Sequence, residues 1–454
     1  MKKVLLQFFL VMLPVVVAAY DAEIDGFYYN FDETNRTATV TFGLRDYSGE
    51  ITIPSEVTYN GDNYSVTSLG YNAFACCYNL TSIIIPNSVT SIEPCAFEEC
   101  LSLSSITIPK SVTSIGYLAF KGCCGLTSIT IPYSTTSIGY GVFAECPNIS
   151  TIIVDEENTV YDSRDNCNAI IEKVTNTLVA GCKNTSIPPS ATSLGRYAFF
   201  GCSSLSSITI PNNITSIGEC ALQDCTGLSS ITIPNSVTTI GNLAFRNCSG
   251  LTSITIPNSV TSIDYNAFQG CSGLTSITIP NSITSISNHT FSGCTSLTSV
   301  IIPNSVTSIM ASAFAYCNNL KDFYCYAEEV PATEIANPFI DSSYKSATLH
   351  VPANAINDYM TRSPWSDFGT IVTLTESTTV ADVNLNTMMI HNNDHLLSIE
   401  GVEKGMAICI YDISGKLLSS TTAAADVTTI RTSLPTGSIV IVKIGDISVR
   451  VLLK

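Results

Sequence analysis

The chain has 454 residues, of which 13% are charged, and its net charge at pH 7 is -17. So acidic a chain offers no basic stripe that could neutralise phosphates and release their counterions. The composition therefore excludes a nucleic-acid-binding protein.

The first 19 residues have the pattern of a signal peptide. Lys2 and Lys3 precede an apolar run from Val4 to Val17, interrupted by Gln7, and the run ends in small residues up to Ala19. It is too short to span a bilayer, which takes roughly 20 apolar residues. The alternative is a buried N-terminal strand. We expect cleavage and a secreted mature chain without a membrane span or lipid anchor, since no Cys follows the cleavage region.

Residues 20–68 are expected to form an N-terminal β cap and the first coil of a repeat. Phe27–Phe31 and Thr37–Phe42 alternate in polarity on either side of a turn-forming stretch, which indicates a hairpin. Asn60-Gly61 is typical of a type I′ turn in a second hairpin, and Ile51–Pro54 already matches a repeat strand. Such a cap covers a strand edge that would otherwise pair with other chains.

A unit of 23 residues then recurs along the chain, well represented by Ser236–Asn258. Position 0 of each unit is Leu or Ile, position +5 is Phe with one Leu (Leu222), and position +8 is always Cys. Position +11 is Leu or Ile, and positions +14 and +16 are mostly Ile or Val. Position 0 falls at Leu69, Ile92, Ile115, Ile138, Leu194, Ile217, Ile240, Ile263, Ile286 and Ile309. A fixed short period with apolar residues in register predicts a solenoid, interrupted once by an insertion of 33 residues.

One unit could not fold alone. About seven buried apolar side chains contribute roughly 2 kcal/mol each, whereas ordering the backbone costs about 1–2 kcal/mol per residue. Stacked units bury each apolar column on both sides and pair their Ile-rich segments as parallel strands about 4.8 Å apart.

The repeat resembles a known family. Leu251, Ile254 and Ile256 match the leucine-rich repeat core, and the trailing Pro257 together with the Ala-Phe-x-x-Cys segment resembles the BspA-like, or Treponema-type, leucine-rich repeat proteins. The resemblance covers about residues 50–330. It implies a mainly β leucine-rich repeat solenoid over residues 69–374, with short parallel strands, helical turns and a hairpin cap. Ser replaces the usual ladder Asn in most units, at Ser88, Ser111, Ser236, Ser259, Ser282 and Ser305, against a single Asn213.

The insertion, about residues 155–187, contains the two alternating segments Asn168–Glu172 and Thr177–Gly181. We expect a hairpin that leaves the rod, with Cys167 and Cys182 directly opposite each other and a possible disulfide. The BspA-like proteins have a similar interruption. Its acidic residues could gather a Ca²⁺, but they lack the spacing and the Gly of an EF-hand, so we expect a solvated loop and no metal site; they are Asp155, Glu156, Glu157, Asp162 and Asp165.

The ten Cys residues at position +8 form a column of their own. In an exported chain an even total of 18 Cys invites disulfides, but in-register side chains point the same way. We expect mostly free, buried thiols, with successive cross-links as the alternative.

Beyond the repeats, residues 322–374 are expected to close the solenoid, with Trp365 as part of an aromatic plug. A polar linker (375–386) leads to a C-terminal domain (387–454) of short alternating strands. Its Tyr411-Asp-Ile-Ser-Gly-Lys416 and Leu434-Pro-Thr-Gly437 segments resemble the C-terminal sorting domain of the type IX secretion system. That resemblance implies recognition by the secretion machinery at the outer membrane; the alternative is a small β-sandwich that merely ends the chain.

The sequence contains no catalytic or nucleotide-binding signature and no framed Cys-His or Ser-His pair. Serine and threonine fill repeated outward columns, which do not form a pocket of unlike groups, so we expect no enzyme and no cofactor. The family resemblance implies a cell-surface protein that adheres to host extracellular-matrix proteins or to proteins of neighbouring cells. A structural spacer and a glycan-binding module are the alternatives.

Tyrosines recur at the variable turn positions after position 0, and they are the candidate partner-binding residues because Tyr offers a large contact area at low entropic cost. They could equally be ordinary surface residues. The set is Tyr71, Tyr117, Tyr140, Tyr197, Tyr265 and Tyr316.

Overall fold

The computed structural model describes residues 20–43, 46–333 and 337–374 and, in the C-terminal part, seven strands between residues 389 and 452 together with Ala423. The predicted signal peptide and linker lie outside the described residues. The chain divides into two compact units, Met1–Val372 and Thr373–Lys454, and each is described by itself.

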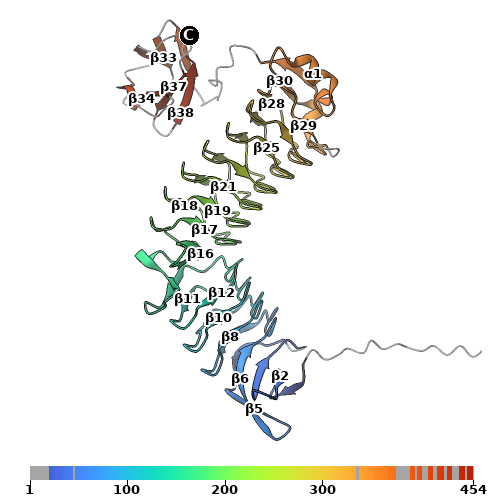
Figure 1. Cartoon of the computed structure of the whole chain (residues 1–454), viewed down its shortest axis with the longest axis vertical. Helices are drawn as coiled ribbons and strands as arrows, with labels where there is room; N and C mark the ends of the chain where they lie inside the picture. Colours follow the sequence, from blue (N-terminus) through green and yellow to red (C-terminus); the bar gives the residue numbers. More distant parts are fainter. Residues whose placement is uncertain are drawn as a thin grey trace, which may run out of the picture. The chain divides into compact units, whose positions relative to one another are not determined.

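The first unit begins with the expected β cap (Figure 1). Three antiparallel strands lead into the first coil: β1 (Ala22–Ile24), β2 (Phe27–Asp32) and β3 (Thr37–Val40). Strand β5 (Glu56–Tyr59) forms the second hairpin with the start of β6 (Asp62–Leu69), and the two turn residues Asn60 and Gly61 have φ angles of 53° and 88°. Positive φ at both turn positions is the mark of a type I′ turn, so this prediction is confirmed.

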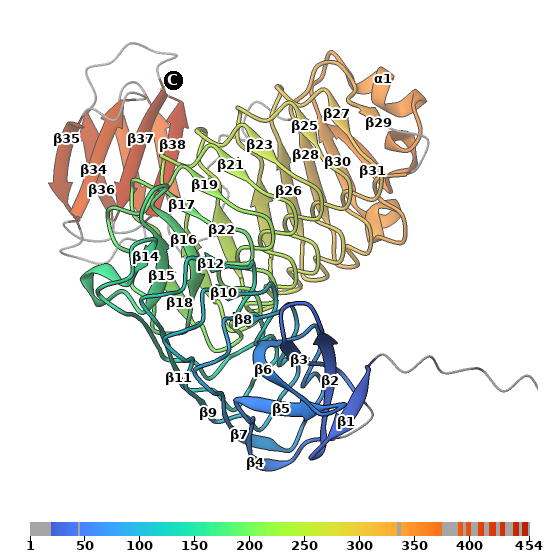
Figure 2. The same ribbon diagram turned by 60° about the horizontal axis from the view of Figure 1, so that its bottom comes forward.

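Each coil then contributes two short strands, and most strands pair in parallel with their counterparts in the next coil (Figure 2). Ile231, for example, pairs with Ile254, one repeat later. The strands that contain position 0 are the end of β6, β8 (Ser91–Ile92), β10 (Ser114–Ile115), β12 (Ser137–Ile138), β17 (Ser193–Leu194), β19 (Ser216–Ile217), β21 (Thr239–Ile240), β23 (Ser262–Ile263), β25 (Ser285–Ile286) and β27 (Ser308–Ile309).

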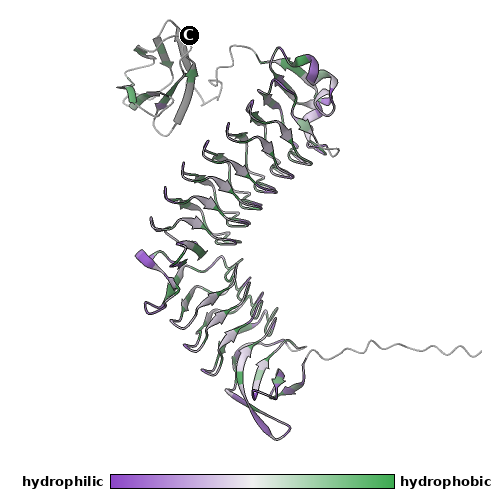
Figure 3. Ribbon diagram, in the orientation of Figure 1, coloured by the Kyte–Doolittle hydropathy of each residue, from purple (hydrophilic) through white to green (hydrophobic). Residues whose placement is uncertain are grey.

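The second strand of each coil covers positions near +14. These strands follow β4 (Gly49–Thr52) and are β7 (Leu80–Ile84), β9 (Ser105–Ile106), β11 (Ser128–Ile131), β13 (Thr151–Val154), β18 (Ser207–Thr209), β20 (Ser230–Thr232), β22 (Ser253–Thr255), β24 (Ser276–Thr278) and β26 (Ser299–Ile302). In β18, β20, β22 and β24 the residues alternate exposed, buried, exposed, so Ile faces inward and Ser and Thr face outward. Figure 3 shows hydrophobic and hydrophilic residues following one another along the coils.

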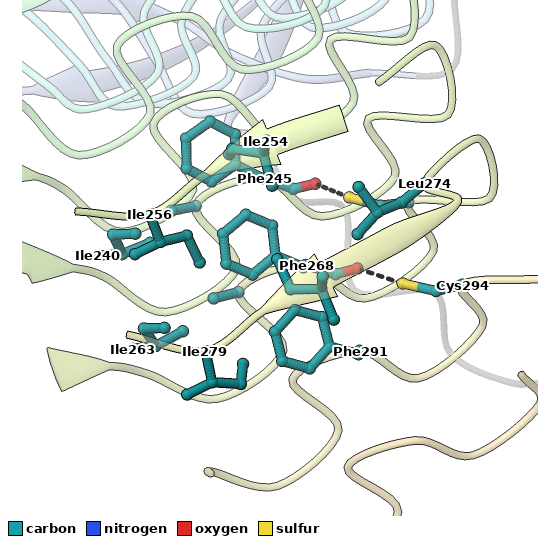
Figure 4. Close-up of a cluster of buried hydrophobic side chains, with 14 of the residues drawn as sticks. Ile240, Phe245, Ile254, Ile256, Ile263, Phe268, Leu274, Ile279, Phe291 and Cys294 are labelled. Atoms are coloured by element: carbon teal, nitrogen blue, oxygen red, sulfur yellow. Dashed lines mark hydrogen bonds between the residues drawn. The ribbon is translucent and has the colours of Figure 1, made fainter. Parts of the chain in front are cut away.

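The interior consists of continuous columns. The rings at position +5 stack face to face, with centroids 5.1 Å apart and planes 3° apart for Phe245 and Phe268 (Figure 4). Every Phe at position +5 is buried or nearly so. Since most of these rings are covered by the ring of the next coil, each coil depends on its neighbours for its core.

The turn between the two strands, positions +2 to +8, is held by a main-chain ladder between coils. The N–H of Phe97 donates to the carbonyl of Ala119 at 2.8 Å, and the equivalent bond recurs in later coils. The turn reverses the chain through left-handed residues at positions +3 and +7, for example Asn266 with φ 57° and Gly270 with φ 71°. Gly, Asn and Asp adopt this conformation most readily, but several coils hold other residues there, such as Leu243 with φ 59° and Tyr316 with φ 57°.

Serine hydroxyls form hydrogen bonds between coils at the positions of the missing ladder Asn. Ser111 Oγ donates to the carbonyl of Val89 at 2.6 Å, and Ser236 Oγ donates to Ile214 at 2.6 Å, in each case bridging to the preceding coil. Each such bond satisfies a turn carbonyl. Not every member is paired, since the buried Oγ atoms of Ser88 and Ser259 have no hydrogen-bond partner among the residues that the structure describes.

The insertion does not leave the rod, and that prediction is wrong. It contains β14 (Tyr161–Asp162), the 3-10 turn η1 (Arg164–Asn166), β15 (Ala169–Glu172) and β16 (Thr177–Gly181). β16 pairs in parallel with β17, with Leu178 opposite Leu194. The hairpin lies within the stack because its apolar side chains are buried there. Ile171 and Leu178 join the core of the later coils, whereas Ile170 and Ala180 join the core of the earlier coils.

A cap of several short elements closes the first unit. They are β28 (Asp322–Cys325), β29 (Ala332–Thr333), η2 (Ser343–Ser346), β30 (Thr348–Val351), α1 (Ile356–Thr361), η3 (Trp365–Asp367) and β31 (Thr370–Thr373). Trp365 is 1% exposed, and its indole N–H donates to the carbonyl of Pro331 at 3.2 Å. The expected aromatic plug is confirmed.

The second unit is an antiparallel β structure of two sheets. One contains β32 (Met389–Asn393), β33 (Leu396–Glu400) and β36 (Val427–Arg431); the other contains β34 (Ala407–Asp412), β35 (Leu417–Thr422), β37 (Ile439–Ile444) and β38 (Ile447–Leu452). Buried residues of both sheets form one cluster, for example Leu397 and Ile430 with Ile408 and Val442. Two sheets around one core make a small β-sandwich.

Candidate interaction surface

The cysteine column is structural. Its thiols are free and buried, and each donates, with few exceptions, to the carbonyl at position +5 of the preceding coil; Cys294 Sγ lies 3.3 Å from the carbonyl oxygen of Phe268 (Figure 4). Burial raises the pKa of the Cys271 thiol from 9.0 to about 12. A thiol that stays protonated is neither a nucleophile nor a metal ligand, so the column has no chemistry to perform.

The predicted disulfide is absent, because Cys167 and Cys182 are both free. Ala169 pairs with Gly181, and a bulge between Ile170 and Ile171 shifts the register by one residue. Cys167 is therefore not directly opposite Cys182, and the two belong to different apolar clusters. A one-residue shift moves a side chain to the other face of a strand.

The structure places five of the six candidate tyrosines in solvent on the turn side of the coils. Tyr71 and Tyr140 are 62% and 55% exposed, and the others are Tyr117, Tyr265 and Tyr316. Four of the five stand at position +2, directly after the first strand, whereas Tyr316 stands at position +7. Tyr197 differs, because it is only partly exposed and packs against Phe200 with ring centroids 5.4 Å apart.

The turn ladder passes over the insertion and joins coils that are far apart in sequence. The N–H of Glu145 donates to the carbonyl of Phe200 at 2.9 Å. As a result Arg196 lies over the rings of both Tyr140 and Tyr197, at 5.4 and 5.1 Å from their centroids. Its guanidinium also pairs with Glu219 at 3.0 Å.

Carboxylates lie between the tyrosines on the same turns. Lys121 Nζ is 3.0 Å from Glu98 Oε1 and 3.9 Å from Glu145 Oε2. Burial raises the pKa of Glu145; Lys121 opposes this shift, and the nearby carboxylates of Asp224 and Glu99 add to it. Lys121 thus pairs with two carboxylates, and the net charge of Lys121 together with the surrounding Glu side chains is negative.

A second exposed column, at position +9, was not predicted from the sequence. Tyr78 and Leu101 are 44% and 43% exposed there, and Cys124 and Pro147 follow at the same position in the next two coils. In the later coils this position is polar, at Ser203, Thr226, Ser249, Ser272, Thr295 and Asn318. The break in the repeat was visible in the sequence and would have indicated the column.

The strand face, formed by the outward residues of the second strand of each coil, differs from the turn side. Ser230 and Thr232 on β20 pair in register with Ser253 and Thr255 on β22, and all four are exposed. This face presents the same Ser and Thr hydroxyl groups in β18, β20, β22 and β24, whereas Ile replaces the Thr at Ile84, Ile153 and Ile301. The described residues hold no group of three or more His, Cys, Asp or Glu side chains that could bind a metal ion.

Stacked 23-residue coils with two parallel strands each and a shared apolar interior define a leucine-rich repeat solenoid. The sequence profile of the BspA type leucine rich repeat region matches the chain in six copies, over residues 67–177, 179–272 and 238–360. The chain therefore belongs to the BspA-type leucine-rich repeat family.

Several solved structures are similar. A leucine-rich repeat protein from Bacteroides ovatus shares 27% identity over 78% of this chain and 100% of its own, with a TM-score of 0.47. One from Eubacterium ventriosum shares 23% identity over 71% of this chain and 94% of its own, with a TM-score of 0.55. A leucine rich cell surface protein from Faecalibacterium prausnitzii shares 28% identity over 67% of this chain and 94% of its own, with a TM-score of 0.36. No curated protein matches the chain.

Proposed function

We propose that this protein is a secreted cell-surface scaffold that binds other proteins without catalysing a reaction, and that it acts in adhesion to host or neighbouring-cell proteins. The observation that carries the proposal is the row of exposed tyrosines on the turn side, above all Tyr71, Tyr117 and Tyr140. Interfaces are enriched in Tyr, which combines a large apolar ring with a polar tip.

The rigid stack supports this role. The turn residues are fixed by the ladder between coils, so little conformational entropy is lost when a partner binds. A spacer would have no need for exposed rings, and a glycan platform would be expected to carry Trp, whereas Trp365, the only Trp in the chain, is buried in the cap.

The experiment is capture of surface proteins by the mature full chain. Immobilised residues 20–454 are exposed to host extracellular-matrix proteins, mucins and surface proteins of neighbouring bacteria. Replacing Tyr71, Tyr117 and Tyr140 together by Ser should weaken binding of a captured partner by roughly 100-fold or more, at about 1–2 kcal/mol for each ring.

Tyr133→Ser is the matched control, since Tyr133 is also an exposed tyrosine but lies outside the turns. Its binding should be unchanged. If substitution of Thr232, Thr255 and Thr278 by Lys abolishes capture while the tyrosine variant binds normally, the strand face is the binding surface. Capture of no protein at all would favour the spacer.

The proposal includes a secretion signal in the C-terminal unit. The C-terminal unit would direct the chain through a type IX secretion system, and among the described residues no helix has the length and apolarity needed to cross a membrane. In a host with that system, deletion of residues 387–454 should leave the solenoid in the periplasm. Normal surface display of the shortened chain would contradict the assignment.

A further inference from the structure

The exposed apolar side chains are unevenly distributed among the coils. We call residues 69–154 the first four coils and residues 194–325 the last six. Large exposed apolar residues of the last six coils are Tyr265 and Tyr316. Those of the first four coils are Tyr71, Tyr78, Ile84, Leu101, Tyr117, Tyr133, Tyr140 and Ile153. Since both groups share the same repeat, the accumulation in the first four coils is not a by-product of the fold.

Five of these residues lie at the two ends of the turns of the first four coils. Tyr71, Tyr117 and Tyr140 stand at position +2, where the turn begins, and Tyr78 and Leu101 stand at position +9, where it ends. Apolar residues gathered in this way on a soluble protein mark a surface that another molecule covers.

The middle of the turn carries the acids. Glu98 and Glu99 occupy positions +6 and +7 of the second coil, and Glu145 occupies position +7 of the fourth. Glu98 is paired with Lys121. Glu99 has a different partner: its Oε2 accepts a hydrogen bond from the hydroxyl of Tyr78 at 3.4 Å. This contact places a carboxylate directly beside the exposed ring at position +9.

The positive charges nearby are already engaged. Lys121 lies between Glu98 and Glu145. Arg196, at the far end of the row, is paired with Glu219. The surface therefore keeps an excess of carboxylate between two rows of apolar side chains.

We infer that the turn side of the first four coils, at Tyr71, Tyr78, Leu101, Tyr117 and Tyr140 around Glu98, Glu99 and Glu145, is the docking surface for a basic amphipathic segment of a partner protein. This rests on the proposed protein-binding function and names the chemistry of the partner. Apolar groups of such a segment cover the two rows, and its Lys or Arg side chains meet the carboxylates and the faces of the tyrosine rings.

The chemistry excludes other partners. An acidic segment, a nucleic acid or an anionic membrane would be repelled by the carboxylates. A basic but wholly polar segment would leave the apolar rows uncovered and would bind only through screened surface charges, which contribute little.

The test measures binding of labelled synthetic peptides to the mature full chain by fluorescence anisotropy. The probes are an amphipathic Lys/Leu peptide, its Glu/Leu counterpart and a Lys/Ser peptide of the same length. We expect the Lys/Leu peptide to bind at least ten-fold more tightly than the other two. Tighter binding of the Glu/Leu peptide, or no binding of the Lys/Leu peptide, overturns the inference.

Two pairs of variants locate the surface. Glu98→Gln/Glu99→Gln should weaken Lys/Leu binding at least ten-fold, whereas Glu328→Gln/Glu329→Gln, which removes the same charge at exposed sites of the C-terminal cap, should leave it unchanged. Tyr78→Ser/Leu101→Ser should likewise weaken binding, and Tyr265→Ser/Tyr316→Ser should not. Circular dichroism confirms that each variant is folded.

Equal losses in the test and control variants would mean attraction by net charge alone and would overturn the inference. This failure is distinct from failure of the proposed function. If the full chain captures surface proteins and Glu98→Gln/Glu99→Gln captures them equally well, protein binding stands and the surface assigned to it is wrong. If it captures none, the proposed function itself fails.

Discussion

The first four and the last six coils are built on the same interior and carry different surfaces. Both bury the Cys of position +8 and the Phe of position +5, and both bridge their turns with Ser hydroxyls, as at Ser111 and Ser236. The exposed apolar rows are concentrated in the first four. Interior positions are fixed because every coil must fit its neighbours, so the difference between the two parts arises where side chains face solvent.

The interiors also differ at one position. In the first four coils the Phe rings stack without interruption, at 5.2, 5.2 and 5.8 Å between successive centroids. In the last six, Leu222 replaces one ring, and the regular stack starts again only at Phe245. The two parts also have separate apolar clusters, divided at the inserted hairpin. They can therefore be compared as two cores within one unit.

Alkaline pH should produce the largest effect. Burial raises the pKa of the thiols of Cys202, Cys271 and Cys317 from 9.0 to about 12. A group whose pKa is higher in the folded state stabilises the fold fully below the pKa of the unfolded chain and loses this contribution as the pH rises toward the folded value. Each such thiol should cost roughly 1 kcal/mol per pH unit above about 9.

The last six coils have more column thiols, so they should open at lower pH than the first four. Trp365 reports on them alone, because it is the only Trp and belongs to their apolar cluster. Between about pH 9 and 11 its fluorescence should change before the far-ultraviolet circular dichroism signal is lost completely. Replacing Cys248 and Cys271 by Ala should move the transition to higher pH. Coincident transitions that these substitutions leave in place would contradict the role of the thiols.

Loss of one ring should be the next largest effect. Phe268 is stacked on both sides, at 5.1 and 5.4 Å, so Phe268→Ala should lower the free energy of unfolding by about 3–5 kcal/mol. Denaturant titration followed by Trp365 fluorescence measures this loss. Phe97→Ala, in the other cluster, should be as costly by circular dichroism and should leave the Trp365 midpoint unchanged. A shift of that midpoint by Phe97→Ala would show that the two parts unfold as one.

The smallest effect concerns the thiol hydrogen bonds. Cys248 Sγ lies 3.1 Å from the carbonyl oxygen of Leu222, and Cys248→Ala should cost about 1 kcal/mol at pH 7. Cys77 belongs to the first coil, and its thiol lies farther from the carbonyl oxygen that it faces, Ala75 O of its own coil, at 4.0 Å. Cys77→Ala should therefore cost measurably less in the same titration. Equal costs would mean that packing alone explains the column.

The repeat could be predicted from the sequence because its cause is local and periodic. Positions 0, +5 and +8 are apolar in every unit, and a column of that kind has one physical explanation. The type I′ turn at Asn60 and Gly61 was equally predictable, since it depends on two adjacent residues.

The insertion was harder to predict because its packing is not local. Whether Ile170 and Leu178 face solvent or the stack depends on neighbours that only the fold brings together. The bulge between Ile170 and Ile171 shifts the register of one strand by one residue, and no residue type in the sequence predicts it. Because of this shift Cys167 does not lie directly opposite Cys182. The partial burial of Tyr197 has a different, local origin: it stands at position +3, and its neighbours in sequence Phe200 and Arg196 pack on its ring.

The hydroxyl and thiol bridges between coils join residues at a constant separation in sequence, as Ser111 and Val89 or Cys294 and Phe268 do. Duplication or loss of one whole repeat in the gene would recreate every bridge, whereas a change of any other length would break the bridges that span it. Near-identical repeats also favour unequal recombination. Evolution could thus lengthen or shorten this protein in steps of about 4.8 Å without redesigning its interior, and a lineage could adjust how far the proposed docking surface stands from the chain's C-terminal cap.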